Sequence, residues 1–234
     1  MSKELQKRIL SSFVLIPTAL FFIIKGTYFF NFFILICLFV SIYEWHNMSK
    51  KKEHKILGII FLILSFYSAY YFRNEFYGDY LYFIMIIFIC VFTDIGGYIF
   101  GNFFKGPKLT KISPKKTYSG VIGGYLFSII FMALFFSYLD DISEITNIKA
   151  TAKELSLNNF ILTIFISTVS QLGDIFVSYF KRKSKIKDTG KIIPGHGGLL
   201  DRIDGMIFAF PAAYLIYKLL YWWKKKSLYL DQQD

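Results

Sequence analysis

The residues best able to carry chemistry in this sequence are acidic side chains set in or beside long apolar stretches. Asp94 lies well inside one apolar run, and Asp174 lies near the end of another. Asp201 and Asp204 stand three residues apart, a spacing that places both carboxylates on one face of a helix. Acids in such segments are costly and usually face a cavity, so these four residues and Glu44, at the inner end of another apolar run, are the candidates for function.

Converging carboxylates would repel one another unless a cation neutralised them. Oxygen ligands from aspartates suit Mg²⁺, which binds through one or two carboxylates together with substrate phosphates. We therefore predict a metal site made by Asp174, Asp201 and Asp204. Asp94 has a second interpretation, because Gly96, Gly97 and Gly101 beside it could be a helix-packing stripe.

The segment between Asp174 and Asp204 favours phosphate binding. Basic residues are followed by a Pro-Gly-His-Gly-Gly turn at residues 194–198 and then by the two acids. The turn's glycines allow left-handed backbone angles, which can direct successive amide N–H groups toward one anion. The helix that starts there adds its N-terminal dipole. Phosphate donors beside metal-binding carboxylates are typical of phosphoryl or nucleotidyl transfer, and we favour a donor or loop-structural role for His196.

A second basic loop, residues 109–124, offers similar groups. Ser113, Lys115, Lys116 and Thr117 supply donors just before a glycine-rich helix start. The loop lacks the GxxxxGK[ST] pattern of a phosphate-binding P-loop. An ordinary cytoplasmic loop with a helix start is the alternative interpretation.

The composition indicates what must position these residues. Of 234 residues, 55% are hydrophobic, 21% aromatic and only 18% charged, and the mean hydropathy is +0.46. Soluble domains carry roughly 25% charged residues, so this chain lacks a solvated surface. The net charge of +11 suits anionic lipid. Nucleic acid is excluded as a partner because the basic groups lie in short loops between apolar stretches.

The sequence predicts an all-α fold: a polytopic integral membrane helical bundle with about seven to eight transmembrane helices. Crossing a bilayer takes about 20 apolar residues, and helices pair every backbone amide inside the segment. Seven stretches qualify: Ile9–Ile24, Tyr28–Tyr43, Ile56–Phe72, Tyr80–Phe104, Val121–Leu139, Phe160–Phe180 and Ile203–Trp223.

The charges of the loops predict the orientation. Lysines and arginines gather before the first stretch and after the second, fourth and sixth, so these loops should face the cytoplasm. One feature disagrees, because seven crossings place Lys224–Lys226 outside, which leaves the span count open. Glu44, beside Trp45 at the inner end of the second stretch, is favoured as an interfacial cap.

The block from Ser178 to Asp204 resembles the integral-membrane phosphatidate cytidylyltransferases, also called CDP-diacylglycerol synthases. Their C-terminal signature runs S-x-apolar-K-R-x4-K-D-x-G-x2-apolar-P-x-H-G-G-apolar-x-D-R-apolar-D. The chain fits it at Ser178, Phe180, Lys181, Arg182, Lys187, Asp188, Gly190, Ile193, Pro194, His196, Gly197, Gly198, Leu199, Asp201, Arg202, Ile203 and Asp204. The elements Asp94–Tyr98 and Ser113–Thr117 are similar to the family's and occur in the same order.

The resemblance implies an enzyme that joins CTP and phosphatidic acid to give CDP-diacylglycerol and pyrophosphate. It implies Mg²⁺ as cofactor, with room for a second, monovalent cation such as K⁺. The catalytic residues would be Asp174, Asp201, Asp204 and Lys187. The substrate-binding residues would be Ser113, Lys115, Lys116, Thr117, Lys181, Arg182, Asp188, His196, Gly197, Gly198, Arg202 and Asp94.

We expect residues 1–80 to form N-terminal transmembrane helices that match the family only weakly. Residues 81–234 would form the catalytic transmembrane core, with cytoplasmic loops at 105–118 and 181–202. The expected location is a bacterial-type cytoplasmic membrane, with the active site on the cytoplasmic leaflet. A homodimer is left open.

Two residues depart from the family pattern: Ser119 stands where Glu or Gln is usual, and Gly97 where Ala is common. Two other functions remain at this stage. A CTP-dependent membrane lipid kinase would share the acids and basic loops but release CDP. An ion-coupled transporter would use intramembrane acids to relay ions, although no internal repeat is visible.

Overall fold

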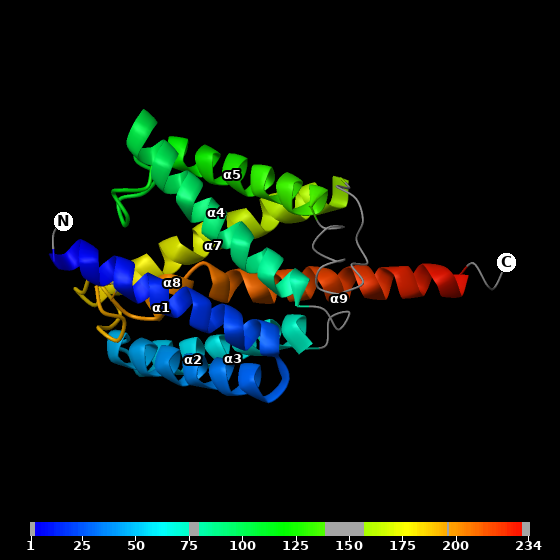
Figure 1. Cartoon of the computed structure of the whole chain (residues 1–234), viewed down its shortest axis with the longest axis horizontal. Helices are drawn as coiled ribbons and strands as arrows, with labels where there is room; N and C mark the ends of the chain where they lie inside the picture. The colour runs from blue at the N-terminus through cyan, green and yellow to red at the C-terminus, as the bar shows by residue number, and fades with distance from the viewer. Residues whose placement is uncertain (1–2, 75–79, 139–156, 196, 231–234) are drawn as a thin grey trace.

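Helices make up most of the part of the chain that the structure describes. The computed structural model describes residues 3–74, 80–138, 157–195 and 197–230 (Figure 1). The helices are α1 (Lys3–Lys25), α2 (Thr27–Met48), α3 (Lys52–Asn74), α4 (Leu81–Phe104), α5 (Tyr118–Ser137), α7 (Leu157–Lys183), α8 (Leu200–Ile203) and α9 (Met206–Leu230). Within these ranges, β structure is limited to isolated bridges in two loops, Lys108 with Thr117 and Ile193 with Gly197. The all-α prediction is confirmed.

In the part of the chain that the structure describes, five helices are long and apolar enough to cross a membrane: α2, α3, α4, α5 and α7. The first and last predicted spans fall on α1 and α9, whose apolar parts are shorter, Phe13–Lys25 and Met206–Leu220. Many large apolar side chains point outward; Phe39 is 67% exposed and Phe103 80%. Such a surface is stable against lipid and unstable in water, so the chain is an integral membrane protein.

The loops predicted to be cytoplasmic all lie at one end of the bundle. The start of α1 and the α2–α3, α4–α5 and α7–α8 connections gather at the left of Figure 1. The helix α9 runs away from them and ends at the opposite side of the molecule. The end of α9 that carries Lys224–Lys226 is therefore far from the other basic loops. The fold thus places these three lysines at the end opposite to the loops predicted to be cytoplasmic, as the count of seven crossings implied.

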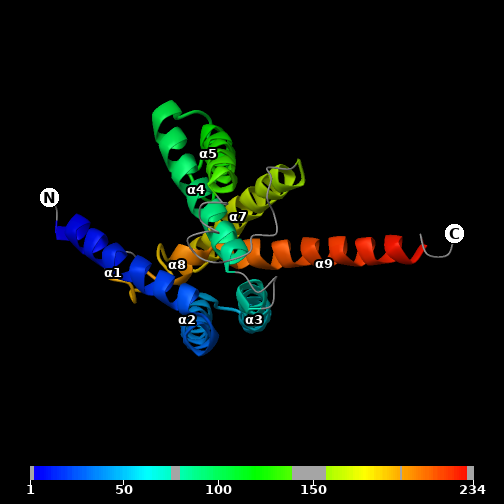
Figure 2. The ribbon, with the colours of Figure 1, turned by 45° about the vertical axis from the view of Figure 1, so that its right-hand side comes forward.

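The helices form two outer groups around a central pair. In Figures 1 and 2, α4 and α5 lie side by side on one side, α2 and α3 on the other, and α7 and α9 between them. Aromatic rings join the groups: Phe83 of α4 meets Phe30 of α2 edge-on with centroids 5.4 Å apart, and stacks on Phe210 of α9 at 5.0 Å. Ser65 of α3 donates a hydrogen bond to the Ile207 carbonyl of α9 at 2.6 Å.

The contact between α4 and α5 depends on glycines in both helices. A Cβ on Gly96 would collide with the Gly123 carbonyl, and a Cβ on Gly123 would lie 2.6 Å from the Gly96 carbonyl. A Cβ on Gly120 would lie 2.9 Å from the Gly97 carbonyl. The two backbones therefore touch, as small-residue helix contacts allow. The helix-packing interpretation of the stripe beside Asp94 is thus confirmed.

The backbone contact between α4 and α5, which we call the glycine seam, predicts that alanine substitutions at two neighbouring glycines have unequal effects on stability. Gly96→Ala should lower the free energy of unfolding by about 1–3 kcal/mol, because the new methyl group meets a backbone carbonyl that cannot rotate away. Gly97→Ala is the matched control, because its Cβ would be 3.5 Å from the Gly120 carbonyl, an ordinary contact. Unfolding of the purified protein in detergent micelles measures both. Equal stability of the two variants would contradict the backbone contact.

Candidate active site

Two carboxyl groups lie near each other at the end of the bundle where the basic loops gather, which we call the basic end. Asp174 of α7 and Asp204, in the turn between α8 and α9, lie close enough for their carboxyl groups to interact electrostatically. Asp204 is only 8% exposed, and its Oδ1 accepts the Gly205 N–H at 3.0 Å. Two ionised carboxylates are acceptors only, so they can stay together only with a proton or a cation between them. We call Asp174 and Asp204 the acid pair.

The α4–α5 loop reaches into the acid pair. Lys116 Nζ lies 2.5 Å from Asp174 Oδ2 and also donates to the Gln171 carbonyl at 3.2 Å. Ser178, one turn further along α7, donates to Asp174 Oδ1 at 3.2 Å. Both side chains of the ion pair remain partly open, at 23% exposed for Lys116 and 27% for Asp174. This part of the site is therefore accessible to a ligand.

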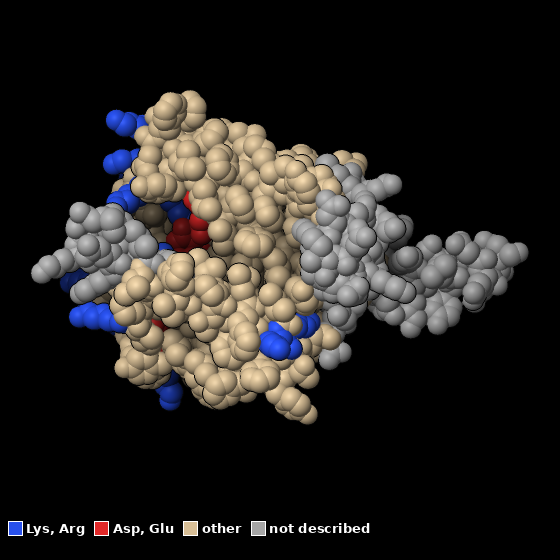
Figure 3. Space-filling model, viewed as in Figure 1, with Lys and Arg blue, Asp and Glu red and all other residues tan. Residues whose placement is uncertain are grey.

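Asp94 faces the same region from α4. Its side chain is exposed and interacts electrostatically with Asp174, Lys116 and Arg202. Figure 3 shows acidic atoms set back in a recess at the end of the molecule where lysines and arginines gather. Three separate elements, α4, α7 and the α8–α9 turn, thus bring acids to one place.

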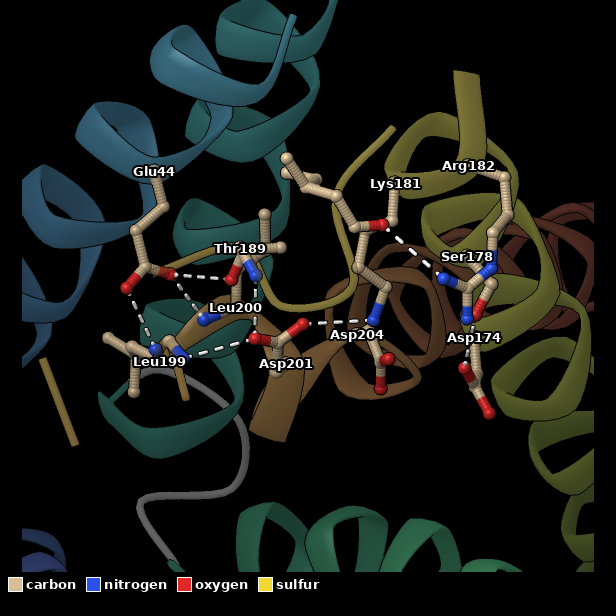
Figure 4. A network of polar contacts seen from close by, with 12 residues as sticks. Glu44, Asp174, Ser178, Lys181, Arg182, Thr189, Leu199, Leu200, Asp201 and Asp204 are labelled. Carbon is tan, nitrogen blue, oxygen red and sulfur yellow. Dashed lines mark hydrogen bonds and ion pairs between the residues drawn. The ribbon is translucent and has the colours of Figure 1, made fainter. Parts of the chain in front are cut away.

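Asp201 is bound differently from the acid pair, although it stands only three residues before Asp204. Its Oδ1 accepts a hydrogen bond from Lys181 Nζ at 2.9 Å. Its Oδ2 accepts the backbone N–H groups of Thr189 at 2.8 Å and Gly198 at 3.0 Å (Figure 4). Both oxygens are thus used within the chain, and Asp201 holds the α7–α8 loop, residues 184–199.

Lys181 connects Asp201 to the acid pair. It is 9% exposed, and besides its bond to Asp201 it interacts electrostatically with Asp174 and Asp204. A buried ammonium group among carboxylates lowers their mutual repulsion. The spacing of Asp201 and Asp204 predicted carboxylates on one face of a helix, and in the structure each carboxylate has its own set of partners.

Glu44 of α2, a candidate acid for which the sequence favoured the role of an interfacial cap, binds the α7–α8 loop. It is 1% exposed, so the expectation of an interfacial cap is wrong. Its carboxylate accepts the N–H groups of Leu199 at 3.0 Å and Leu200 at 2.8 Å, and the Thr189 hydroxyl at 3.1 Å (Figure 4). The one signal in the sequence was a glutamate at the inner end of an apolar stretch. A glutamate exposed at the membrane surface would give the same signal.

The predicted residues of the α4–α5 loop have mixed positions. Lys115 is exposed, whereas Lys116 reaches the acid pair. The Ser113 carbonyl accepts the Lys116 N–H at 3.0 Å, so Ser113 shapes the turn. Thr117 caps α5 by accepting the Gly120 N–H at 3.1 Å, and Ser119 lies 3.0 Å from the Thr117 hydroxyl.

The predicted residues of the α7–α8 loop are mostly at its surface. Lys187, Asp188, Arg182 and Arg202 are exposed. Arg182 donates to the Ile186 carbonyl at 3.4 Å. His196 lies outside the described residues.

The glycine turn has the predicted backbone but is already hydrogen-bonded. Gly195 and Gly197 have positive φ angles of 76° and 88°. The Gly197 N–H donates to the Ile193 carbonyl at 3.2 Å, and the Gly198 N–H donates to Asp201. Phosphate binding by these two amides stays a prediction, and it would require them to exchange partners.

No three His, Cys, Asp or Glu side chains within the described ranges are grouped closely enough to hold a metal ion by themselves. The acid pair supplies two such ligands at most, so a bound cation would need further oxygens from a ligand or water. Elsewhere, a cavity of about 240 Å³ lined by Trp45, Phe176 and Phe208 is apolar and contains none of the candidate residues.

Comparison with known proteins gives consistent matches. The family model described as the cytidylyltransferase family matches residues 6–76 and 56–220. A phosphatidate cytidylyltransferase of Rickettsia felis is 34% identical over 216 residues, which covers 89% of this chain and 90% of that protein. One of Rickettsia bellii is 35% identical over 231 residues, covering 92% and 94%. One of Staphylococcus saprophyticus is 39% identical over 158 residues, covering 67% and 55%.

The burial of Lys181 makes a stability prediction. Lys181→Met removes the cation from Asp201 and leaves its buried carboxylate uncompensated, so we expect a loss on the order of 3 kcal/mol in the free energy of unfolding. Lys115→Met, at an exposed position of the other basic loop, should change it by less than about 0.5 kcal/mol. Unfolding in detergent micelles compares the two. A Lys181→Met protein as stable as the Lys115→Met protein would contradict the ion pair.

Proposed function

The chain belongs to the cytidylyltransferase family, and we propose that it condenses CTP with phosphatidate to form CDP-diacylglycerol and pyrophosphate. A phosphate oxygen of phosphatidate attacks the α-phosphorus of CTP. The bond from that phosphorus to the oxygen bridging the β-phosphorus breaks, and pyrophosphate leaves. The lipid-kinase and transporter alternatives are not favoured by the named relatives.

One observation carries the proposal: an acid pair with a partly open lysine, in a recess at the basic end of a membrane bundle. Phosphoryl transfer needs positioning and charge stabilisation more than covalent help from the protein. Lys116 is placed to accept a phosphate in exchange for Asp174, because its ion pair is partly exposed. The exposed Lys115, Lys187 and Arg202 would then hold the remaining phosphate oxygens.

The acid pair fits a magnesium ion. Its two carboxyl groups, one buried on Asp204 and one partly exposed on Asp174, lie near each other, and positive charge or a proton lowers their repulsion. Both are oxygen ligands of the kind Mg²⁺ prefers. When bound, Mg²⁺ would neutralise charge on the transferring phosphoryl group. Asp201 would join Asp174 and Asp204 as a ligand only by giving up Lys181. A second, monovalent cation such as K⁺ stays an expectation.

The bundle suits a substrate that remains in the bilayer. Because the recess opens at the end with the basic loops, we propose that the site faces the cytoplasmic leaflet of a bacterial membrane. The acyl chains of phosphatidate can stay in lipid while the headgroup reaches the acid pair. Anionic headgroups are attracted by the same lysines that orient the protein. Assembly as a homodimer is not needed for this arrangement.

Turnover tests the proposal directly. Purified protein in mixed micelles with phosphatidate should transfer the label of α-³²P-CTP into a lipid product and release one pyrophosphate per lipid formed. Mg²⁺ should be required, so that excess EDTA abolishes the transfer and added Mg²⁺ restores it. Release of CDP with a phosphorylated lipid would instead show a kinase, and full activity in EDTA would exclude the metal.

The acid pair makes the sharper mutational test. Asp174→Asn should reduce kcat by roughly 100- to 1,000-fold, because it removes charge that faces the transferring phosphoryl group. Asp204→Asn should have an effect of similar size. Glu53→Gln, on the exposed first turn of α3, should leave kcat unchanged. Near-normal turnover by a folded Asp174→Asn protein would remove the acid pair from the mechanism.

A further inference from the structure

Two buried carboxylates hold the α7–α8 loop from opposite sides. Asp201 binds the N–H groups of Thr189 and Gly198, and Glu44 binds the Thr189 hydroxyl and the N–H groups of Leu199 and Leu200. Thr189 therefore contacts both acids, through its backbone and its side chain (Figure 4). Together these bonds fix the beginning and the end of the stretch from 189 to 200.

Glu44 reaches this loop across a sequence distance of 145 to 156 residues. Burying a carboxylate at 1% exposure is costly unless it is fully hydrogen-bonded. Its three partners, Thr189 and Leu199 in the loop and Leu200 at the start of α8, therefore account for its place in the fold. Hydrogen bonds from N–H groups to an ionised acceptor are also stronger than neutral ones. The three hydrogen bonds to Glu44 therefore hold the loop more firmly than the bridge between Ile193 and Gly197 inside the loop does.

Two glycines of the loop are shaped around the Glu44 carboxylate. A Cβ on Gly190 would lie 2.5 Å from Glu44 Oε1, and a Cβ on Gly198 would lie 2.6 Å from Glu44 Oε2. Neither glycine has a positive φ angle, so backbone conformation does not require them. Glycine is required at both positions because the loop backbone approaches Glu44 closely.

We infer that Glu44 is a positioning residue for the transfer reaction. It touches none of the groups that would react. It holds Thr189, Thr189 donates to Asp201, and Asp201 holds Lys181 beside Asp174 and Asp204. Release of the loop from Glu44 would thus let Lys181 move away from the acid pair. This inference rests on the proposed function and deepens it by adding a residue from α2.

Glu44→Gln is the test, because Gln keeps the shape but replaces one acceptor oxygen with an NH₂ group that faces N–H donors. We expect kcat to fall roughly 10- to 100-fold, as for other outer residues that orient a site. The KM for CTP should change less than about threefold, because the exposed lysines that meet the triphosphate are untouched. Thr189→Ala removes one of the three bonds and should give a smaller loss of kcat.

Limited trypsin digestion supplies a readout that does not depend on turnover. The loop region carries exposed cleavage sites at Arg182, Lys183, Lys185, Lys187 and Lys191. Cleavage there in the folded protein should be faster in Glu44→Gln, and intermediate in Thr189→Ala, because local opening of the loop becomes easier. Glu53→Gln is the matched control and should match the wild type in both assays.

Opposite results would overturn the inference. A folded Glu44→Gln protein with wild-type kcat excludes a positioning role. The role is also excluded if trypsin cleaves Glu44→Gln at the wild-type rate and the activity of this variant falls only as much as its fraction of unfolded protein rises. If Glu44→Gln does not fold, Thr189→Ala decides, and wild-type kcat and cleavage in that variant overturn the inference. A wild-type protein that does not use CTP would refute the proposed function, while the digestion still reports whether Glu44 holds the loop.

Discussion

The structure depends on how buried carboxylates are neutralised at the basic end of a membrane bundle. Asp174 faces Lys116, Asp201 faces Lys181, and Glu44 faces backbone N–H groups. Asp204 interacts with the carboxyl group of Asp174 and with the ammonium group of Lys181. In low dielectric an unpaired charge costs several kcal/mol, so each of these contacts constrains where its helix or loop can lie. The acid pair is the place where two carboxyl groups come together, and Lys116 and Lys181 supply the positive charge beside it.

The helices serve this arrangement by bringing distant segments to one level. The glycine seam between α4 and α5 sets Asp94 and the Lys116 loop against α7, because the two backbones touch over Gly96 and Gly123. The hydrogen bond from Ser65 to the Ile207 carbonyl joins α3 to α9 near the start of that helix. A rigid scaffold with polar groups at one end suits a reaction that depends on positioning, because displacement by an ångström can cost much of the rate.

The position of the recess suits one substrate from the bilayer and one from water. Phosphatidate cannot leave the bilayer without exposing its acyl chains, whereas CTP must come from water. A recess at the basic end of the bundle can be reached by both substrates, phosphatidate from the bilayer and CTP from water. Positive side chains lie at the surface of this end, and the acids lie deeper. The same arrangement explains the net charge of +11, most of which is carried by loops on one side of the membrane helices.

Composition and hydropathy alone determined the class of protein, the helices and the end at which the polar residues gather, because a bilayer imposes length and charge rules that each segment obeys locally. The pattern from Ser178 to Asp204 likewise pointed to the transfer of phosphate groups. Only the tertiary structure decided which acids meet. The sequence grouped Asp201 with Asp174 and Asp204, but the side chain of Asp201 turns to Lys181 and the loop, and Glu44 arrives from α2. Such pairings depend on contacts between residues far apart in the chain, and no local pattern encodes them.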